Sequence, residues 1–239
     1  FPYTTLFRSV FIAGNHDYIS ARSNYMGFTW SDHVHMLNEN VLDSIYLEEI
    51  NTEIYGFSYH TREITEPRYD KVRPGCEERI NILLAHGGNE KNIPIDKKAL
   101  LSNGFDYIAL GHIHKPQIFS DRMAYVGSFE PMDKNETGAR GYIIGEIEKK
   151  EDTSTIAIEF ISSSIRQYFK IDLPVCQGLT NGAMLDMAKV KILENGTKNM
   201  YVFRLIGIRD TDIVFHKEDF NTLGNVIEVV DEKIGRAHV

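Results

Sequence analysis

The stretch Tyr107–His114 reads YIALGHIH, and it predicts both the fold and the site. Its first four residues are apolar and predict a buried strand, after which Gly111 releases the chain into a loop with two histidines. On a continuing strand the two rings would point to opposite faces, whereas in a loop both can turn toward one place. Parallel α/β sheets bind ligands outside the carboxyl ends of their strands. The stretch therefore predicts an α/β fold with a metal site at that edge.

Two further predicted strands end in residues of the same kind. Residues 10–13 are followed by Gly-Asn-His-Asp at 14–17, and residues 79–85 are followed by His-Gly-Gly at 86–88. A single histidine after a strand is more often a polar loop residue than a metal ligand. Three strands that each end in such residues indicate a metal site far more specifically than one strand does. We therefore expect the three loops to build one metal site.

Composition narrows the classes of protein. The 239 residues are 42% hydrophobic and 25% charged, which is typical of a soluble globular chain of one large or two small domains. The sequence has no membrane-spanning apolar run and no signal peptide, so we expect no membrane association. Cys76 and Cys176 form no motif, which favours a reducing, cytoplasmic location. The net charge of -8 argues against a broad basic surface for nucleic acid, although metal cations supply positive charge locally.

The two ends of the chain have an unusual sequence. Residues 1–9 read FPYTTLFRS and residues 234–239 read IGRAHV, and both resemble translated sequencing adapters. We therefore expect residues 1–9 and 234–239 to be artefacts, and the gene to be cut at both ends. The alternative, a genuine N-terminal strand of odd composition, stays open.

A run of charged residues at 148–152 predicts a domain boundary. We expect a first domain over residues 10–150 and a second, compact α+β domain over residues 151–233. A helix over 180–195 should place Leu185, Ala188 and Ile192 on one face and end at Gly196. The other expected helices are 96–103 and 216–223, and the expected strands are 10–13, 33–37, 43–50, 53–60, 79–85, 105–110, 123–126, 141–147, 155–161, 166–173, 200–208 and 226–230.

The order GNHD, then a lone histidine, then GHxH resembles the calcineurin-like metallophosphoesterase superfamily. The segments AGNHD, YGFSYHTREI, DYIALGHIHKPQ and YVGSFEP followed by GARGYIIGEI are similar to the SbcD/YhaO-type nuclease subunits of DNA-repair exonucleases. This resemblance covers residues 10–233. It implies a metallophosphoesterase-type β-sandwich flanked by helices, with a smaller α+β capping domain. The family pattern begins with DxH and GD motifs that are absent here, so the resemblance implies an N-terminally truncated domain.

The resemblance also implies two divalent metal ions. Asn15, His86 and His112 would bind one ion, and His114 would bind the other, whose remaining ligands belong to the absent motifs. Such a pair clamps the attacking and leaving oxygens of a phosphoryl displacement. Mixed nitrogen and oxygen ligands suit Mn²⁺, with Fe²⁺ and Zn²⁺ as alternatives.

Catalytic roles are implied for the two residues that follow Asn15. His16 would face the scissile phosphate and stabilise charge or protonate the leaving oxygen. Asp17 would hold the His16 ring in orientation. Other histidines have simpler interpretations. His33 and His35 should lie on the solvent-exposed face of a strand, and His60 should have a structural role or lie on the surface. Among the basic residues, Lys97, Lys98 and Arg140 should be solvated charges.

The implied function is that of a DNA exonuclease and endonuclease subunit acting on DNA ends in double-strand break repair. The implied partners are DNA, an SMC-like ABC ATPase subunit of the SbcC type and a second copy in a homodimer. One alternative is a phosphodiesterase acting on nucleotides or other phosphoesters, and another is a catalytically silent DNA- or partner-binding scaffold. For this chain, with only part of the ligand set, we expect weak single-site metal binding and little or no nuclease activity.

Overall fold

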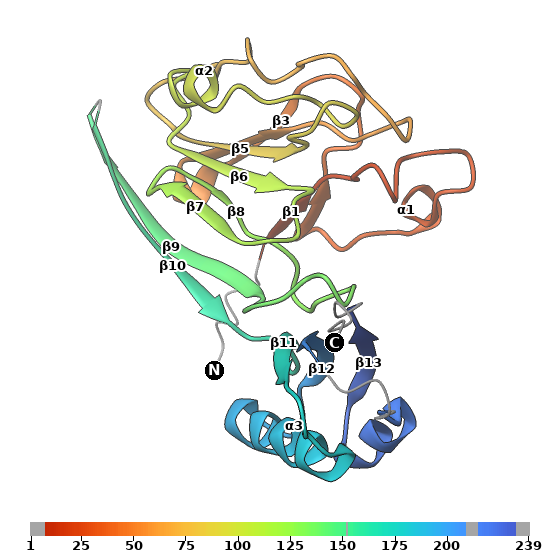
Figure 1. Cartoon of the computed structure of the whole chain (residues 1–239). Coiled ribbons are helices and arrows are strands. Elements are labelled where there is room, and N and C mark those ends of the chain that lie inside the picture. The colour runs from red at the N-terminus through yellow and green to blue at the C-terminus, as the bar shows by residue number, and fades with distance from the viewer. Residues whose placement is uncertain (1–7, 152, 209–214, 233–239) are drawn as a thin grey trace, which may run out of the picture. The chain divides into compact units, whose positions relative to one another are not determined.

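The computed structural model of the chain describes residues 8–151, 153–208 and 215–232. These residues form two compact units (Figure 1). The first contains the described residues of Phe1–Ser128 and Tyr142–Ile161, and the second contains those of Phe129–Gly141 and Ser162–Val239. The chain therefore passes from one unit to the other three times.

A six-stranded mixed sheet forms the centre of the first unit. Its strand order is β3-β4-β5-β6-β8-β7. The neighbours from β4 to β8 run parallel, whereas β3 and β7 pair antiparallel at the two edges. The carboxyl ends of the four inner strands therefore meet at one edge of the sheet, where α/β proteins bind ligands. The strands are β3 (Asp43–Leu47), β4 (Thr52–Gly56), β5 (Ile80–His86), β6 (Tyr107–Gly111), β7 (Gln117–Ser120) and β8 (Met123–Tyr125).

The core of this unit holds β5 and β6 in place. Leu83 and Ala85 of β5 are buried, with Ile108 and Leu110 of β6 beside them in the same cluster. Burying a side chain such as Leu83 contributes roughly 1.5–3 kcal/mol. The short helix α2 (Lys97–Leu101) adds its one buried residue to this cluster. The two strands that deliver the histidines are thus among the most firmly packed elements of the unit.

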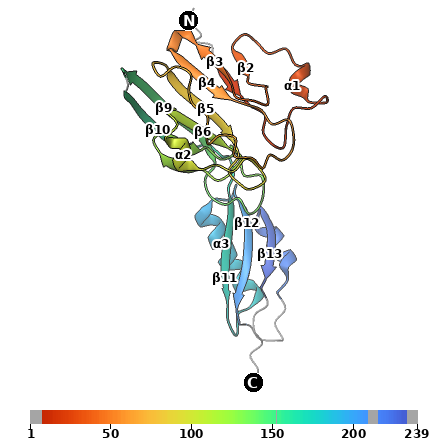
Figure 2. The ribbon, with the colours of Figure 1, turned by 90° about the horizontal axis from the view of Figure 1, so that it is seen from above.

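The remaining elements of the first unit lie around this sheet. β1 (Ser9–Phe11) and β2 (Val34–Met36) form a two-stranded parallel sheet. β9 (Gly141–Lys150) and β10 (Thr153–Ser162) form a long two-stranded ribbon, visible in Figure 1 and from above in Figure 2. Two short helical segments, α1 (Asn24–Gly27) and η1 (Glu48–Ile50), complete the unit.

The second unit has a three-stranded, fully parallel sheet in the order β11-β12-β13. Helix α3 connects β11 to β12, and its buried residues Met184, Ala188 and Ile192 pack into a core with aromatic residues of β12. Thr180 caps the start of α3, because its hydroxyl accepts a hydrogen bond from the Ala183 amide. The elements are β11 (Tyr168–Val175), α3 (Asn181–Asn195), β12 (Met200–Gly207), η2 (Lys217–Leu223) and β13 (Val226–Asp231).

The architecture is a mixed α/β fold with a central mixed sheet, consistent with a metallophosphoesterase fold. The division into units lies elsewhere than at residue 150, however. The charged run begins within β9, and both strands of the ribbon lie in the first unit. Glu148 and Lys150 of this run are exposed at the end of β9, and an exposed strand end has the same composition as a linker.

Several expected elements have different bounds. β4 ends at Gly56, earlier than predicted, because the next residues bond to other loops. The Ser58 amide donates to the Glu39 carbonyl, and the Tyr59 amide donates to the Ala13 carbonyl. The predicted strand over 43–50 divides into β3 and η1. β7 was not predicted, since Ile118 at this sheet edge is half exposed and gives no clear pattern.

The prediction that Arg140 is a solvated charge is wrong. Only 2% of its surface is exposed. Its Nη1 donates hydrogen bonds to the carbonyl oxygens of Thr137 and Ala139, at 3.1 and 3.0 Å. The guanidinium thus closes the loop before β9 by satisfying backbone groups, a role that sequence pattern does not reveal.

The terminal residues expected to be artefacts lie mostly outside the described residues. Residues 1–7 and 233–239 are among those not described, whereas Arg8 and Ser9 are described. β1 begins at Ser9, and Arg8 pairs with Glu49 at 2.6 Å.

Candidate metal centre

His86 and His112 lie side by side because β5 and β6 are parallel neighbours. In the register of this pair, His86 stands opposite Gly111, the residue before His112. The two ring centroids are 5.2 Å apart, and the rings meet edge to face. The register of two buried strands thus brings together histidines that are 26 positions apart in the printed sequence.

Asn15 reaches the same place from the loop after β1. The backbone of Ala13 is held on both sides: its amide donates to the Ser58 hydroxyl at 2.9 Å, and its carbonyl accepts from the Tyr59 amide at 3.1 Å. The Asn15 side chain is buried, with 6% of the residue exposed. Its Oδ1 lies 2.9 Å from His86 Nε2 and 3.2 Å from His112 Nδ1. One amide oxygen and two ring nitrogens therefore converge on a single point.

Gly14 makes this convergence possible. A Cβ atom at this position would lie 2.5 Å from His86 Cε1, so any side chain would displace the ring. His112 contributes a second unusual backbone feature, since its φ of 91° lies in a region that residues other than glycine rarely adopt. Strained backbone of this kind gathers at functional sites, where the surrounding structure enforces it.

Three tyrosine hydroxyls fix the backbone at the end of β5. Tyr69 accepts a hydrogen bond from the His86 amide at 3.0 Å, and Tyr59 donates to the His86 carbonyl at 2.9 Å. Tyr125 donates to the Gly87 carbonyl at 2.9 Å. Burial raises the pKa of each of these hydroxyls, so they remain neutral and able to donate. The loop that carries His86 is therefore held from several sides.

The electrostatic environment keeps the two central rings neutral. Burial lowers the pKa of His86 to about 4, and the nearby His112 acts in the same direction. Burial also lowers the pKa of His112, followed by the influence of His114 and then of His16. A metal ion binds neutral imidazole, since the ligand nitrogen must offer a free electron pair. The site therefore presents its histidines in the charge state that a cation requires.

His16 and His114 lie at the rim of this group. Both are exposed, and both are close enough to influence His86 electrostatically. Asp17 has a different set of contacts from the expected bond to His16. Its Oδ1 accepts from the Gly14 amide at 2.8 Å, and its Oδ2 accepts from the Tyr25 hydroxyl. In this arrangement Asp17 holds the turn that carries Asn15.

Asn89 is a site residue that the sequence analysis missed. Its Nδ2 lies 2.5 Å from His112 Nε2, on the side of the ring away from Asn15. Its Oδ1 accepts from the backbone amides of Lys91 and Asn92, at 3.0 and 2.9 Å. An asparagine directly after His-Gly-Gly was a signal, because asparagine commonly bonds to its own following backbone in turns.

The other histidines play no part in this group. His60 is exposed, and its Nε2 lies 2.8 Å from the Asn38 carbonyl oxygen. The prediction that the His35 ring faces solvent is wrong, because its Nε2 is buried and has no hydrogen-bond partner among the described residues. His35 is half buried on β2, where it pairs with Val10 of β1. A structural role is consistent with this position.

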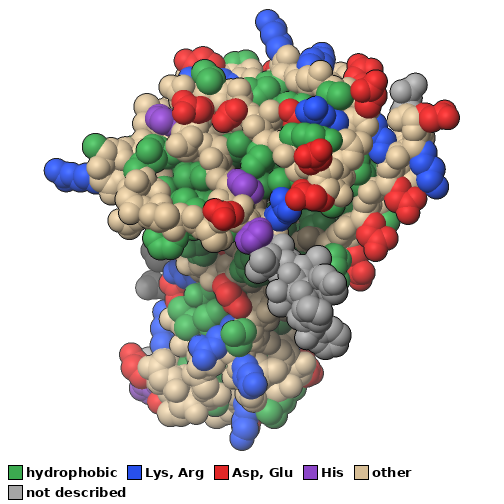
Figure 3. All heavy atoms as spheres, turned by 180° about the vertical axis from the view of Figure 1, so that it is seen from behind, with side chains coloured by type: hydrophobic (Ala, Val, Ile, Leu, Met, Phe, Trp, Pro, Cys, Tyr) green, Lys and Arg blue, Asp and Glu red, His purple; other side chains and the backbone are tan. Residues whose placement is uncertain are grey.

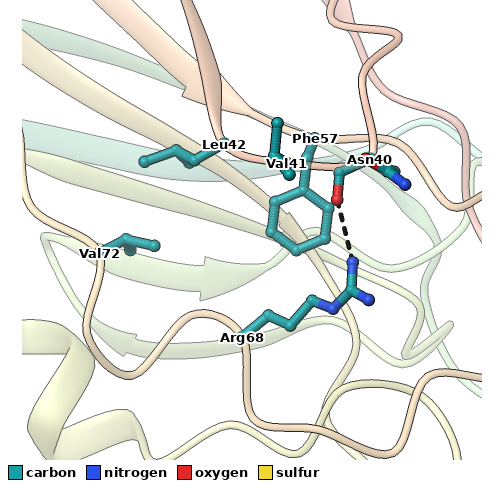
Figure 4. Close-up of a pocket in the computed structure, with 6 residues that line it drawn as sticks. All are labelled: Asn40, Val41, Leu42, Phe57, Arg68 and Val72. Atoms are coloured by element: carbon teal, nitrogen blue, oxygen red, sulfur yellow. Dashed lines mark hydrogen bonds between the residues drawn. The ribbon is translucent and has the colours of Figure 1, made fainter.

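A separate pocket lies elsewhere in the first unit and holds none of these residues. Its volume is about 320 Å³. Figure 4 shows Arg68 reaching across it to the Asn40 carbonyl oxygen, at 3.0 Å from Nη1. The lining is mostly apolar, so the pocket lacks metal-ligand chemistry. Its residues are Asn40, Val41, Leu42, Phe57, Arg68 and Val72.

The donor set of Asn15, His86 and His112 fits a divalent cation. Two imidazole nitrogens and one amide oxygen are ligands that Mn²⁺, Fe²⁺ and Zn²⁺ accept. Within residues 8–151, 153–208 and 215–232, no cluster of three or more His, Cys, Asp or Glu side chains is arranged to hold a metal ion. The amide of Asn15 is thus the donor that completes the set.

Comparison with known proteins agrees with this chemistry. Residues 2–116 match the family described as calcineurin-like phosphoesterase. Over 145 residues the chain is 31% identical to the uncharacterized metallophosphoesterase YhaO of Bacillus subtilis (strain 168), with 56% of this chain and 35% of YhaO aligned. Over 197 residues it is 29% identical to the DNA double-strand break repair protein Mre11 of Methanocaldococcus jannaschii, with 78% of this chain and 49% of Mre11 aligned.

A second archaeal Mre11, from Methanopyrus kandleri, is 33% identical over 94 residues, which are 33% of this chain and 21% of that protein. The chain thus spans less than half the length of each of these curated relatives. None of the described helices combines the length and apolar character that a membrane crossing needs. Phosphoesterases of the matched family use divalent metal ions and hydrolyse phosphoesters. The segment 2–116 thus matches a calcineurin-like phosphoesterase domain, and the similarity to YhaO and Mre11 supports a relation to the SbcD/Mre11 type.

Proposed function

We propose that the chain is part of a metal-dependent nuclease that acts on DNA ends in double-strand break repair. The observation that supports this most is the convergence of His86 Nε2 and His112 Nδ1 on Asn15 Oδ1, at 2.9 and 3.2 Å. The similarity to two Mre11 proteins, which are named for DNA double-strand break repair, supports the choice of DNA as the substrate.

Each residue of the site has a part in phosphodiester hydrolysis. A divalent cation bound by Asn15, His86 and His112 would stabilise negative charge on phosphoryl oxygens and lower the pKa of bound water. His16, exposed at the rim, would stabilise the leaving oxygen or give it a proton. Asp17 would act through the turn that it holds. His114 would bind a second cation, and Mn²⁺ is the proposed metal, with Fe²⁺ or Zn²⁺ as alternatives.

We further propose that the second unit, which contains most of residues 151–233, acts as a capping domain that contacts DNA. Support comes from the independent core of the second unit and from the alignment with Mre11, which covers 78% of this chain and so includes residues of that unit. The proposed assembly is a cytoplasmic homodimer with an SMC-like ABC ATPase of the SbcC type. The free thiols of Cys76 and Cys176 are compatible with a reducing compartment.

A second candidate is a phosphodiesterase that acts on nucleotides or other small phosphoesters. The net charge of -8 favours it, because proteins that bind DNA tightly use many basic contacts. On the face shown in Figure 3, acidic and basic side chains are interspersed rather than sorted into a basic stripe. The same metal site would serve either substrate.

Binding to DNA ends separates these candidates. The chain would be titrated with a fluorescent duplex that has open ends and with the same duplex closed by hairpins, in Mn²⁺. We expect tighter binding to the open duplex, with an affinity that falls as salt increases. Equal or absent binding, together with stabilisation by a mononucleotide, would favour the second candidate. End binding without any Mn²⁺ binding would point to a catalytically silent scaffold.

A further inference from the structure

The hydrogen bonds around His112 define which of its nitrogens carries hydrogen. A neutral imidazole has one N–H and one acceptor nitrogen. Asn89 Oδ1 accepts from the backbone amides of Lys91 and Asn92, so the amide nitrogen of Asn89 faces the ring. That nitrogen only donates, and His112 Nε2 must therefore be the acceptor at 2.5 Å. The hydrogen consequently lies on Nδ1, which donates to Asn15 Oδ1 at 3.2 Å.

This tautomer is the opposite of the one that a metal ion needs. The nitrogen of His112 that lies against Asn15 Oδ1, the oxygen that His86 Nε2 also contacts, is Nδ1, so Nδ1 is the atom on the side of the proposed metal ion. A ligand nitrogen must give up its hydrogen, which then resides on the other ring nitrogen. Ligating histidines donate that N–H to an oxygen acceptor. Asn89 can offer an oxygen to His112 only if its side-chain amide flips by about 180°, which exchanges the positions of Oδ1 and Nδ2.

The residues around Asn89 offer hydrogen-bond partners to its side-chain amide after such a flip. The buried Oδ1 of Asn92 has no hydrogen-bond partner among the described residues, although Asn92 Nδ2 lies 3.3 Å from Asn89 Oδ1. If both amides turn over, Asn89 Nδ2 can donate to that spare oxygen. The Asn92 backbone amide keeps a second acceptor, the Asn89 carbonyl, at 3.2 Å. The Lys91 backbone amide loses its acceptor, and its residue is exposed to water.

We propose that Asn89 is a positioning residue that sets the tautomer of His112 and thereby controls metal affinity. Without metal it holds the hydrogen on Nδ1, and metal binding requires its amide to turn over. The proton moves from Nδ1 to Nε2 with no net change of charge on the ring. This inference rests on the metal-binding part of the proposed function and is independent of the DNA substrate.

Asn89→Asp tests the proposal directly. Aspartate keeps an oxygen for the Lys91 and Asn92 amides, but its second oxygen can only accept. At about pH 8, where imidazole is neutral, it should shift the hydrogen of His112 to Nε2. The nitrogen chemical shifts of the imidazole ring report this in the metal-free chain. We expect Nδ1–H in the wild type and Nε2–H in Asn89→Asp.

Metal affinity supplies the second readout. We expect Mn²⁺ to bind Asn89→Asp about 10-fold more tightly than the wild type. Asn40→Asp, the same chemical change at an exposed position of the first unit, should leave both readouts unchanged. An Nε2–H tautomer in the metal-free wild type, or the same tautomer in wild type and Asn89→Asp, would overturn the proposal. If the wild type bound no Mn²⁺, the proposed function would fail while the tautomer measurement still decided the role of Asn89.

Discussion

His86 Nε2 lies 2.9 Å from Asn15 Oδ1, although the two residues are 71 positions apart in the chain. The contact depends on Gly14, whose missing side chain leaves room for the ring, and on the register that sets His86 at the end of β5. The contact between Asn15 and His86 requires both the glycine at position 14 and this strand register. The pair therefore connects the packing of the fold to the chemistry of the site.

Gly14→Ala should disturb the site through this contact. The new Cβ would lie 2.5 Å from His86 Cε1, and relief of the overlap should cost about 1–3 kcal/mol of unfolding free energy. Mn²⁺ affinity should fall as well, because the ring must move away from Asn15. Gly182→Ala is the matched control: apart from its chain neighbours and the backbone of α3 itself, no atom lies within 4 Å of its Cβ position, and alanine there should stabilise by about 0.5–1 kcal/mol. Equal stabilities and equal affinities for Gly14→Ala and wild type would contradict this view.

Asp106→Ala should destabilise the first unit by about 3–5 kcal/mol in urea denaturation. Asp106 accepts from Lys149 Nζ at 3.0 Å and from the Asn81 amide at 2.7 Å, and both side chains of the ion pair are more than nine-tenths buried. Removing the carboxylate leaves the Lys149 ammonium buried without its partner. Glu194→Ala breaks an exposed pair with Lys191 and should cost no more than about 0.5 kcal/mol. Similar losses in the two variants would show that the buried pair has no special role.

Glu53 should make the stability of the first unit fall in acid. Burial raises the pKa of this carboxyl, but hydrogen bonds from Arg79 and Ser44, each 2.8 Å long, outweigh burial and leave the pKa below its ordinary value. The ionised group therefore stabilises the fold above its unfolded-state pKa of about 4.3. That contribution disappears as pH falls through the lower, folded-state pKa.

The measurement is the urea midpoint of wild type and Glu53→Gln between about pH 7 and about pH 3. Wild type should be the more stable near pH 7, and the two midpoints should approach each other in acid. A constant difference across the whole range would contradict the assigned direction of the pKa shift.

In a chain that also carries the DxH and GD motifs of the family pattern, Asn15→Ala or His112→Ala should lower phosphodiester hydrolysis roughly 100-fold or more, because each removes a proposed metal ligand. His33→Ala should hydrolyse at close to the wild-type rate. His33 precedes β2, and its backbone carbonyl accepts a hydrogen bond from the Ser9 amide at 2.9 Å. A bis-p-nitrophenyl phosphate assay in Mn²⁺ compares the three variants. An inactive His33→Ala would contradict a purely structural role for His33.

Much of the metal centre could be predicted because its residues follow strongly patterned strands. Apolar runs before His86 and Gly111 made β5 and β6 recognisable, and parallel pairing places their ends together. Asn15, His86 and His112 lie close together in the structure, and their binding of one metal ion stays a prediction. Asn89 and Arg140 could not be predicted in the same way, because their roles depend on which loop groups lie beside them.

The division of the chain shows a second limit of sequence patterns. The charged sequence at the end of β9 resembles that of an interdomain linker, because linkers and exposed strand ends are both rich in charged residues. The difference lies in Lys149, whose ammonium turns inward to Asp106. Only the three-dimensional pairing tells this lysine from its exposed neighbour Lys150, whose side chain is 86% exposed.

The most direct test of the central claim is a calorimetric titration of the 239-residue chain with Mn²⁺. We expect one weak site in the wild type, and no detectable binding in Asn15→Ala, His86→Ala or His112→Ala. Two tight sites, no binding by the wild type, or binding that persists in all three variants would contradict the assignment of these residues as the ligands of one metal ion.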